Sequence, residues 1–302
     1  MTCLDKLTKS DCLMVGFIYV ALLLLVFVTF YPFWNSLVIS FNSGQDTSLG
    51  GVTFWPREFT LENYEVVFKD KRLVNAFLIS ILRTVVGTAM SVFVTAMLAY
   101  GLSKKELIGR KYFMIFCLLT MFFSGGLIPT FILIRGIGLY NNFWVMIIPT
   151  LVLVWYMIIF RTFFQQLPKE LEESAQIDGA STWGIFLRIA LPLSIPVIAA
   201  ISLFTAIFHW NDWFLPTIYI TNDKLIPIQT LLQRILNSNT ATQAMANLDA
   251  GSAAHFSKMV TSFTGKSLSM AIMMVATIPI ILVYPFVQKH FVKGVLIGSL
   301  KE

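Results

Sequence analysis

The chain has 302 residues, of which 57% are hydrophobic and only 13% are charged, and its mean hydropathy is +0.76. A soluble domain carries about 25% charged residues, so this composition excludes an ordinary soluble protein and indicates a polytopic membrane protein. The net charge of +6 requires no nucleic-acid partner, because the basic residues gather at the ends of apolar runs, as membrane orientation demands.

Six apolar runs are long enough to cross a bilayer, for which an α-helix needs about 20 residues. The runs cover residues 14–39, 73–102, 112–134, 143–164, 193–218 and 268–287. We therefore predict an all-α membrane protein with six transmembrane helices, folded as one permease domain over residues 1–302.

The basic residues predict the orientation of these spans. With both termini inside, the inner segments hold twelve Lys and Arg residues, whereas the one short outer loop holds only Arg135. Short loops decide orientation more strongly than long ones. Both termini, the loop 165–192 and the tail 288–302 are thus expected in the cytoplasm.

Residues 221–266 form a sizeable polar segment that we expect on the outer side. Its Asn, Thr, Ala and Ser content predicts short helices around a mobile middle. The length suggests a role in docking an external partner. A tolerated surface insertion is the alternative, because a long loop costs little free energy.

The polar insert at residues 165–192 is unlike the rest of the chain. Pro168 suits the first position of a helix, and the acidic residues after it favour the positive end of the helix dipole. Asp178 and Gly179 form a turn signal, and Ser181 can cap a second helix. Two short helices at a sharp angle would make a compact knob that docks on a cytosolic partner.

The residues of this insert carry a specific pattern. It consists of Glu172, Glu173, Ser174, Ala175, Asp178, Gly179, Ala180, Leu191 and Pro192. The pattern resembles the "EAA" loop of bacterial ABC importer permeases, and the chain is similar to the six-span subunit of maltose-type carbohydrate permeases. Ser174 departs from the usual Ala of the family but is also small. Residues 123–130 are typical of a subgroup that handles oligosaccharides.

The resemblance implies a type I ABC importer permease in the bacterial cytoplasmic membrane. It implies four kinds of partner, namely a second permease, a dimer of cytosolic ATPases, an external solute-binding protein and membrane lipid. ATP and Mg²⁺ would lie on the ATPase, so that this chain binds no cofactor. Glu173 would pair with a basic residue of the ATPase, Gly179 would permit the turn, and Ala175 would allow close approach. A solvated surface carboxylate is the alternative for Glu173.

Polar residues within the spans are candidates for the substrate pathway. Arg83 lies about 15 Å into the second run, where a charge is costly and therefore a functional candidate. Its alternatives are a structural pairing with a neighbouring helix or snorkelling to the surface. Trp210, Asn211 and Asp212 suit the apolar faces and hydroxyls of a sugar, or else an aromatic belt with a helix cap. Asn75 is a further candidate, or a packing residue.

Nucleotide chemistry in this chain is not expected. Residues 265–267 resemble the end of a phosphate-binding loop, but the required earlier Gly is Val260, and the segment is predicted outside. The three histidines are scattered and suggest no metal site, and no nucleophile and base are paired. We predict a transport subunit without enzymatic activity of its own.

The expected function is sugar uptake by ATP-driven alternating access, with oligosaccharides as cargo. One alternative is an ABC permease for another solute. The other is an ion-driven secondary transporter, which would require acidic or His relays inside the spans. Away from the ends of the spans only Arg83 and Asp212 are charged, which is little for an ion path.

Overall fold

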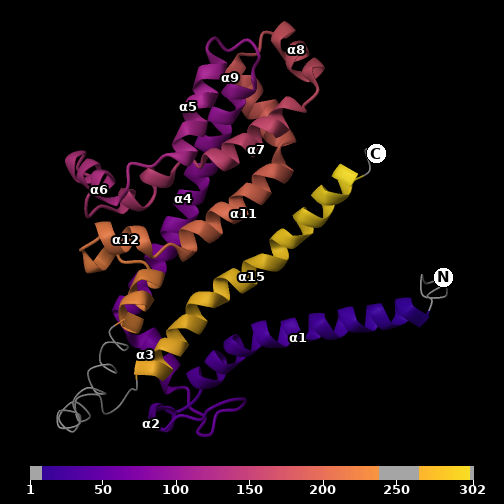
Figure 1. Ribbon diagram of the computed structural model, residues 1–302. Coiled ribbons are helices and arrows are strands. Elements are labelled where there is room, and N and C mark those ends of the chain that lie inside the picture. Colours follow the sequence, from indigo (N-terminus) through magenta and orange to yellow (C-terminus); the bar gives the residue numbers. More distant parts are fainter. Residues whose placement is uncertain (1–8, 238–264, 300–302) are drawn as a thin grey trace. The chain divides into compact units, whose positions relative to one another are not determined.

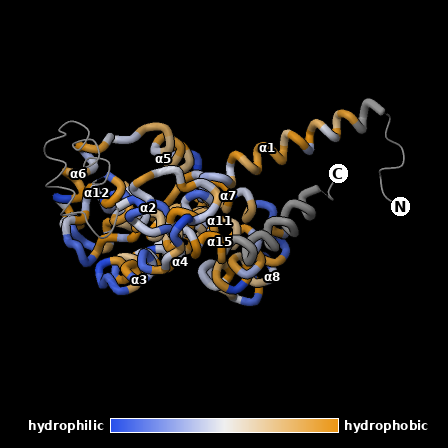
Figure 2. Tube along the Cα trace, turned by 90° about the horizontal axis from the view of Figure 1, so that it is seen from below, coloured by the Kyte–Doolittle hydropathy of each residue, from blue (hydrophilic) through white to orange (hydrophobic). Residues whose placement is uncertain are grey.

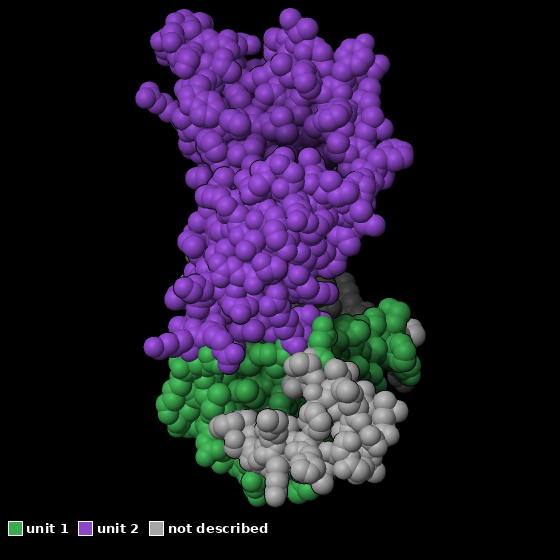
Figure 3. Space-filling view, turned by 90° about the vertical axis from the view of Figure 1, so that its left-hand side faces the viewer, with its two compact units in different colours: residues 1–70, 235–275 green, residues 71–234, 276–302 purple. Residues whose placement is uncertain are grey.

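A computed structural model describes the backbone of residues 9–237 and 265–299, and the side chains of residues 13–237 and 265–282. Most of the expected outer loop 221–266, and the side chains of the expected tail 288–302, lie outside these described residues. The chain divides into two compact units, residues 1–70 with 235–275 and residues 71–234 with 276–302, coloured in Figure 3. A single permease domain over 1–302 stays a prediction.

The first unit begins with a long helix and continues in short elements. These are α1 (Lys9–Ser40), α2 (Gly44–Ser48) and α3 (Glu62–Lys69). Asn42, which is fully buried, holds the segment after α1 in place. Its amide oxygen accepts from the backbone N–H groups of Arg57 (2.9 Å) and Glu58 (3.0 Å), and its amide nitrogen donates to Asp46 (2.8 Å).

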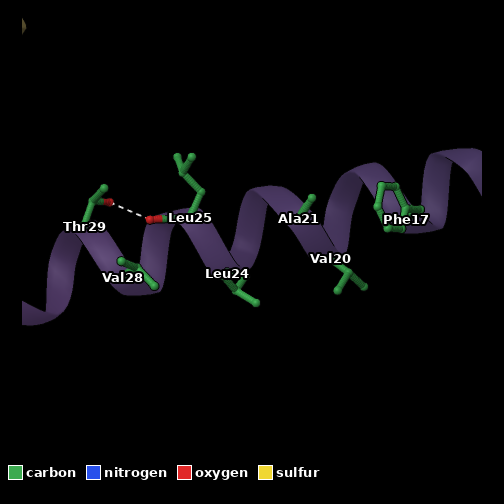
Figure 4. Close-up of a pocket in the computed structure, with 7 residues that line it drawn as sticks. All are labelled: Phe17, Val20, Ala21, Leu24, Leu25, Val28 and Thr29. Carbon is green, nitrogen blue, oxygen red and sulfur yellow. Dashed lines mark hydrogen bonds between the residues drawn. The ribbon is translucent and has the colours of Figure 1, made fainter.

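Helix α1 is apolar over nearly its whole length, as Figure 2 shows. No part of its most apolar window is buried by the described part of the chain. A shallow recess lies along residues 17–29 of this one helix (Figure 4), and the Thr29 hydroxyl is already used, donating to the Leu25 carbonyl at 2.8 Å. Such a surface must be covered by lipid or by another protein.

The second unit contains most of the remaining helices. They are α4 (Lys71–Ser103), α5 (Arg110–Phe122), α6 (Leu127–Gly136), η1 (Phe143–Met146), η2 (Ile148–Thr150), α7 (Val154–Gln165), α8 (Lys169–Ile177), α9 (Thr182–Ile185), the π-helical η3 (Phe186–Ala190), α10 (Leu191–Leu193), α11 (Ile195–Asn211), α12 (Phe214–Tyr219) and η4 (Asp223–Leu225). A last helix, α15 (Gly265–Ser299), belongs to both units.

The all-α membrane fold is confirmed, but half of the expected spans are not single straight helices. By length and composition, three helices of the described chain can cross a membrane, or up to six if each bent pair counts as one span. The pair α5 and α6 is bent by 116°, where Gly126 has a φ of 82° (Figure 1). The expected run 143–164 bends by 53°. The third bent pair, Thr182–Leu193 with Ile195–Asn211, turns by 81° at the start of the expected run 193–218, and that run is also broken after Asn211.

Helices α4, α7 and α11 run side by side and form the core of the second unit (Figure 1). Small residues on α4, such as Ala96 and Ala99, are fully buried and let Phe160 of α7 pack closely. Small residues are the usual means by which membrane helices approach one another. Between α4 and α11 another such point is Gly87, which lies beside the ring of buried His209.

Replacing Gly87 by Ala is expected to destabilise this packing. An added Cβ would lie 2.7 Å from His209 Nε2, and His209 is only 1% exposed, so the clash falls within the packed core. Overpacking of this kind costs about 1–3 kcal/mol. The measurement is the melting temperature of the detergent-purified protein. Gly101→Ala is the matched control, because a Cβ on Gly101 of the same helix meets nothing within 4 Å. Equal melting temperatures for the two variants would contradict the close contact.

Candidate functional site

The polar insert forms the two short helices that its sequence predicts. Helix α8 runs from Lys169 to Ile177, with Pro168 as its N-cap residue rather than its first helical residue. The chain then turns at Gly179, whose φ is 78°, a conformation that favours glycine. Ser181 caps α9 by accepting a hydrogen bond from the Gly184 N–H at 3.1 Å. The expected knob is therefore present (Figure 1).

One face of α8 packs inward while the rest of the helix is exposed. Ala175 contacts the core cluster, and Glu172 is partly buried. Ile177, near the end of α8, is 87% exposed. Of the other residues in the sequence pattern, Leu191 is partly buried. The exposed ones are Glu173, Ser174, Asp178, Gly179, Ala180 and Pro192. Most of the pattern residues therefore lie on the exposed surface of the knob, where a partner can reach them.

Glu172 has a partner within the chain that the sequence did not reveal. Its carboxylate forms an ion pair with Lys104, which follows the end of α4, and accepts a hydrogen bond from the Tyr100 hydroxyl at 3.3 Å. Lys104 Nζ also lies 4.1 Å from the centre of the Tyr100 ring. These three residues, which we name the α4–α8 clamp, join the knob to a core helix. In the sequence, Lys104 served only as one of the basic residues that predict the orientation of the spans. It lies too far along the chain from Glu172 for any local pattern to connect the two.

Glu173 lies next to the clamp in sequence but is not part of it. It lines a cleft of about 630 Å³, together with Lys169 and Gln176 of the same helix. Among the described residues no ion pair to Glu173 is formed, so its carboxylate is available to a partner. The clamp thus fixes the orientation of α8, and Glu173 presents charge at its surface.

Reversing one charge of the clamp is expected to impair transport, and reversing both should restore part of it. Lys104→Glu and Glu172→Lys each replace an attraction by a repulsion, while the double exchange recreates a pair. Because both side chains are partly exposed, we expect a coupling energy of about 1 kcal/mol. A double-mutant cycle on melting temperature and uptake measures it. Lys105→Glu, at an exposed neighbouring position, is the control; additive effects in the cycle would show that the clamp does not exist in the working protein.

A second polar arrangement lies inside the helical core. Arg83 of α4 is fully buried and forms an ion pair with Asp212, which follows α11. Its guanidinium also donates to the Asp212 carbonyl at 2.7 Å and to the Met146 carbonyl at 3.3 Å. The other Asp212 carboxylate oxygen, Oδ1, accepts from the Phe214 and Leu215 N–H groups and caps α12. Within this chain, Arg83 is thus paired with a residue at the end of a neighbouring helix. That pairing is the structural alternative to a pathway role that the sequence left open.

The remaining pathway candidates occupy different positions in the second unit. Trp210 is 6% exposed and donates from Nε1 to the Ala276 carbonyl at 3.0 Å. Asn75 donates to the Lys224 carbonyl at 2.8 Å, whereas Asn211 is exposed. The structure therefore brings Arg83 and Asp212 together but leaves Asn75 apart from them. Contact of any of the five candidates with cargo stays a prediction.

Comparisons with known proteins match most of this chain to components of transport systems. Residues 91–297 match the family model described as "Binding-protein-dependent transport system inner membrane component". The "Polygalacturonan/rhamnogalacturonan transport system permease protein YtcP" of Bacillus subtilis (strain 168) is 40% identical over 285 residues, covering 94% of this chain and 96% of that protein. "Protein LplC" of the same organism is 41% identical, covering 91% of this chain and 90% of that protein.

A solved structure is similar over almost the whole chain. It is a bacterial ABC transporter involved in the import of the acidic polysaccharide alginate, and the matching chain has a TM-score of 0.84 and 28% identity. The match covers 95% of this chain and 99% of the other. The fold of this chain thus matches, over most of its length, one already observed in an importer.

Proposed function

This chain belongs to the family of binding-protein-dependent transport system inner membrane components, and on that premise we propose that it is a permease subunit of an ABC importer for oligosaccharides. The observation that carries the proposal is the 40% identity to YtcP over nearly the full length of both chains. The similarity to an alginate importer supports the same cargo class.

The cargo we propose is an oligosaccharide that contains acidic sugars. Polygalacturonan and rhamnogalacturonan, named for YtcP, and alginate, named for the solved structure, are all built with uronic acids. The acidic cargo named for these two relatives supports the proposal more strongly than the positive charge of Arg83 does. The guanidinium of Arg83 is paired with Asp212. We therefore do not assign the carboxylates of the cargo to Arg83.

The transport cycle that we propose follows alternating access. A loaded solute-binding protein docks on the outer side, while the cytosolic knob sits in a cleft of a separate ATPase, where ATP and Mg²⁺ are bound. Glu173 pairs with a basic residue of that ATPase, and exposed Ile177 enters an apolar part of the same cleft. The clamp passes the displacement of α8 to α4. A second permease completes the pathway, and both termini of this chain face the cytoplasm.

The proposal is tested first by isolating the chain with its partners. A tagged chain is purified in mild detergent from its native membrane, and co-purifying proteins are identified by mass spectrometry. We expect a second permease and an ATPase with a complete phosphate-binding loop. Recovery of the chain alone, after gentle cross-linking as well, would overturn the importer assignment.

Cargo is tested by uptake into cells that carry or lack the gene for this chain. Labelled galacturonate or guluronate oligosaccharides are compared with neutral oligosaccharides of equal length. Loss of uptake of the acidic sugars alone supports the proposed cargo. Loss of uptake of the neutral sugars alone keeps the importer assignment and refutes the acidic cargo.

A further inference from the structure

Three basic residues gather where α5 begins and α7 ends. Arg110 is the first residue of α5, Lys111 follows it, and Arg161 lies on the last turns of α7. Arg110 and Arg161 are half-buried, whereas Lys111 is exposed. The two guanidiniums meet at one neutral group, because the Gln165 amide oxygen accepts from Arg161 Nη2 at 3.1 Å and from Arg110 Nη2 at 3.2 Å. That amide orientation is the one its hydrogen-bond partners require.

The positive charge of this cluster is not neutralised by the described part of the chain. No carboxylate among the described residues forms an ion pair with any of the three. The remaining contact of the Arg161 guanidinium is a hydrogen bond from Nε to the Leu102 carbonyl at 3.0 Å, which is again neutral. Like charges held this close repel one another, so a nearby anion would stabilise the arrangement.

The cluster lines a recess together with two apolar side chains. An open recess of about 510 Å³ is lined by the three basic side chains together with Met114 and Ile115, one turn further along α5. Those two residues lie near the start of the predicted span 112–134, so the recess is lined both by basic side chains and by a surface expected to face lipid. A single anion would contact only the basic side chains. A molecule with an anionic head and an apolar tail would contact the basic and the apolar side chains together.

We propose that this cluster, Arg110, Lys111 and Arg161, is a binding site for the headgroup of an anionic phospholipid. The phosphate accepts from the two guanidiniums and from Lys111, and an acyl chain lies against Met114 and Ile115. Arginine suits this role because its planar fork donates two parallel hydrogen bonds to a phosphate. Basic pockets between membrane helices are known lipid-binding features. The site depends on the membrane location of the chain and is independent of its cargo.

The experiment measures lipid retention by the full-length chain purified with its co-expressed partners. The complex is stripped of lipid, given phosphatidylglycerol or phosphatidylcholine, and analysed by native mass spectrometry. We expect selective retention of phosphatidylglycerol. The double variant Arg110→Gln/Arg161→Gln should bind it roughly thirtyfold more weakly, about fivefold for each removed charge. The matched control, Lys105→Gln/Arg188→Gln, removes two charges from exposed positions elsewhere on the same side and should retain the lipid.

Three results would overturn the site. Equal loss of phosphatidylglycerol in the control would indicate general surface attraction, and equal retention of phosphatidylcholine would remove the selectivity. Thermal stabilisation of the wild-type complex by inorganic phosphate alone, as large as that by phosphatidylglycerol, would make it a site for a free anion. Should the double variant fail to fold, Lys111→Gln decides the matter. Lys111 is exposed, and its removal should weaken lipid binding about fivefold without changing the melting temperature in detergent alone.

Discussion

Replacing Asp212 by Ala is expected to remove most of the folded protein from the membrane. Arg83 is fully buried, and the change would leave its charge without a counterion inside the helical core. Breaking a buried ion pair from one side costs about 3–5 kcal/mol. The total stability of a folded protein is only about 5–15 kcal/mol, so this loss is a large part of it. The α12 cap is lost as well, at a further cost of about 1 kcal/mol.

Two further variants separate the charge from the cap. Asp212→Asn keeps an oxygen that can accept from the Phe214 and Leu215 N–H groups but removes the negative charge. Arg83→Met combined with Asp212→Asn removes both charges and keeps the cap. Because a buried pair is often replaceable by neutral groups without loss of stability, the double variant should be more stable than Asp212→Asn alone.

The measurements are membrane abundance and melting temperature in detergent, followed by uptake. The expected order of stability is Asp212→Ala lowest, Asp212→Asn next, and the double variant close to wild type. A wild-type melting temperature for Asp212→Ala would show that the pair contributes little. Uptake by the double variant then tests the cargo role: normal kinetics argue against contact of Arg83 or Asp212 with sugar, and weakened uptake by a stable protein supports it.

The parts of the fold that follow from local sequence were predictable. Apolar length identifies the membrane segments, and the limits of α4, Lys71 and Ser103, differ little from the expected 73–102. The knob was predictable for the same reason, since Gly179 and the Ser181 cap act within a few residues of themselves. The function class followed because the pattern around Glu173 is also local.

Contacts between distant residues were not predictable from one sequence. Lys104 and Glu172 are 68 residues apart, and Arg83 and Asp212 are 129 apart, so no spacing rule connects either pair. The bends were not predicted for a related reason. Apolar composition indicates that a segment lies in the membrane, but not in which direction its helix runs. The run 112–134 was predicted as one span although Ser124, Gly125 and Gly126 interrupt it, and at Gly126 the chain turns by 116° between α5 and α6.

Replacing Glu173 by Lys is expected to abolish uptake while leaving the protein inserted and folded. The carboxylate is exposed and, within the described residues, is not used in an ion pair, unlike its neighbour Glu172. If it pairs with a basic residue of an ATPase, charge reversal turns that attraction into repulsion at the interface. Losing one partner of a charge pair that becomes buried in an interface costs about 2–5 kcal/mol, which weakens docking more than about tenfold.

The matched control for this variant is Glu170→Lys. Glu170 lies on the same helix, is exposed, and is closer than Glu173 to the positive N-terminal end. Reversing its charge therefore disturbs the helix dipole at least as much as Glu173→Lys does, but changes a residue outside the pattern. Loss of uptake and of co-purified ATPase in Glu173→Lys alone assigns the effect to docking. Equal losses in both variants would instead assign the effect to the stability of α8. Normal uptake by Glu173→Lys would show that Glu173 is an ordinary solvated surface carboxylate.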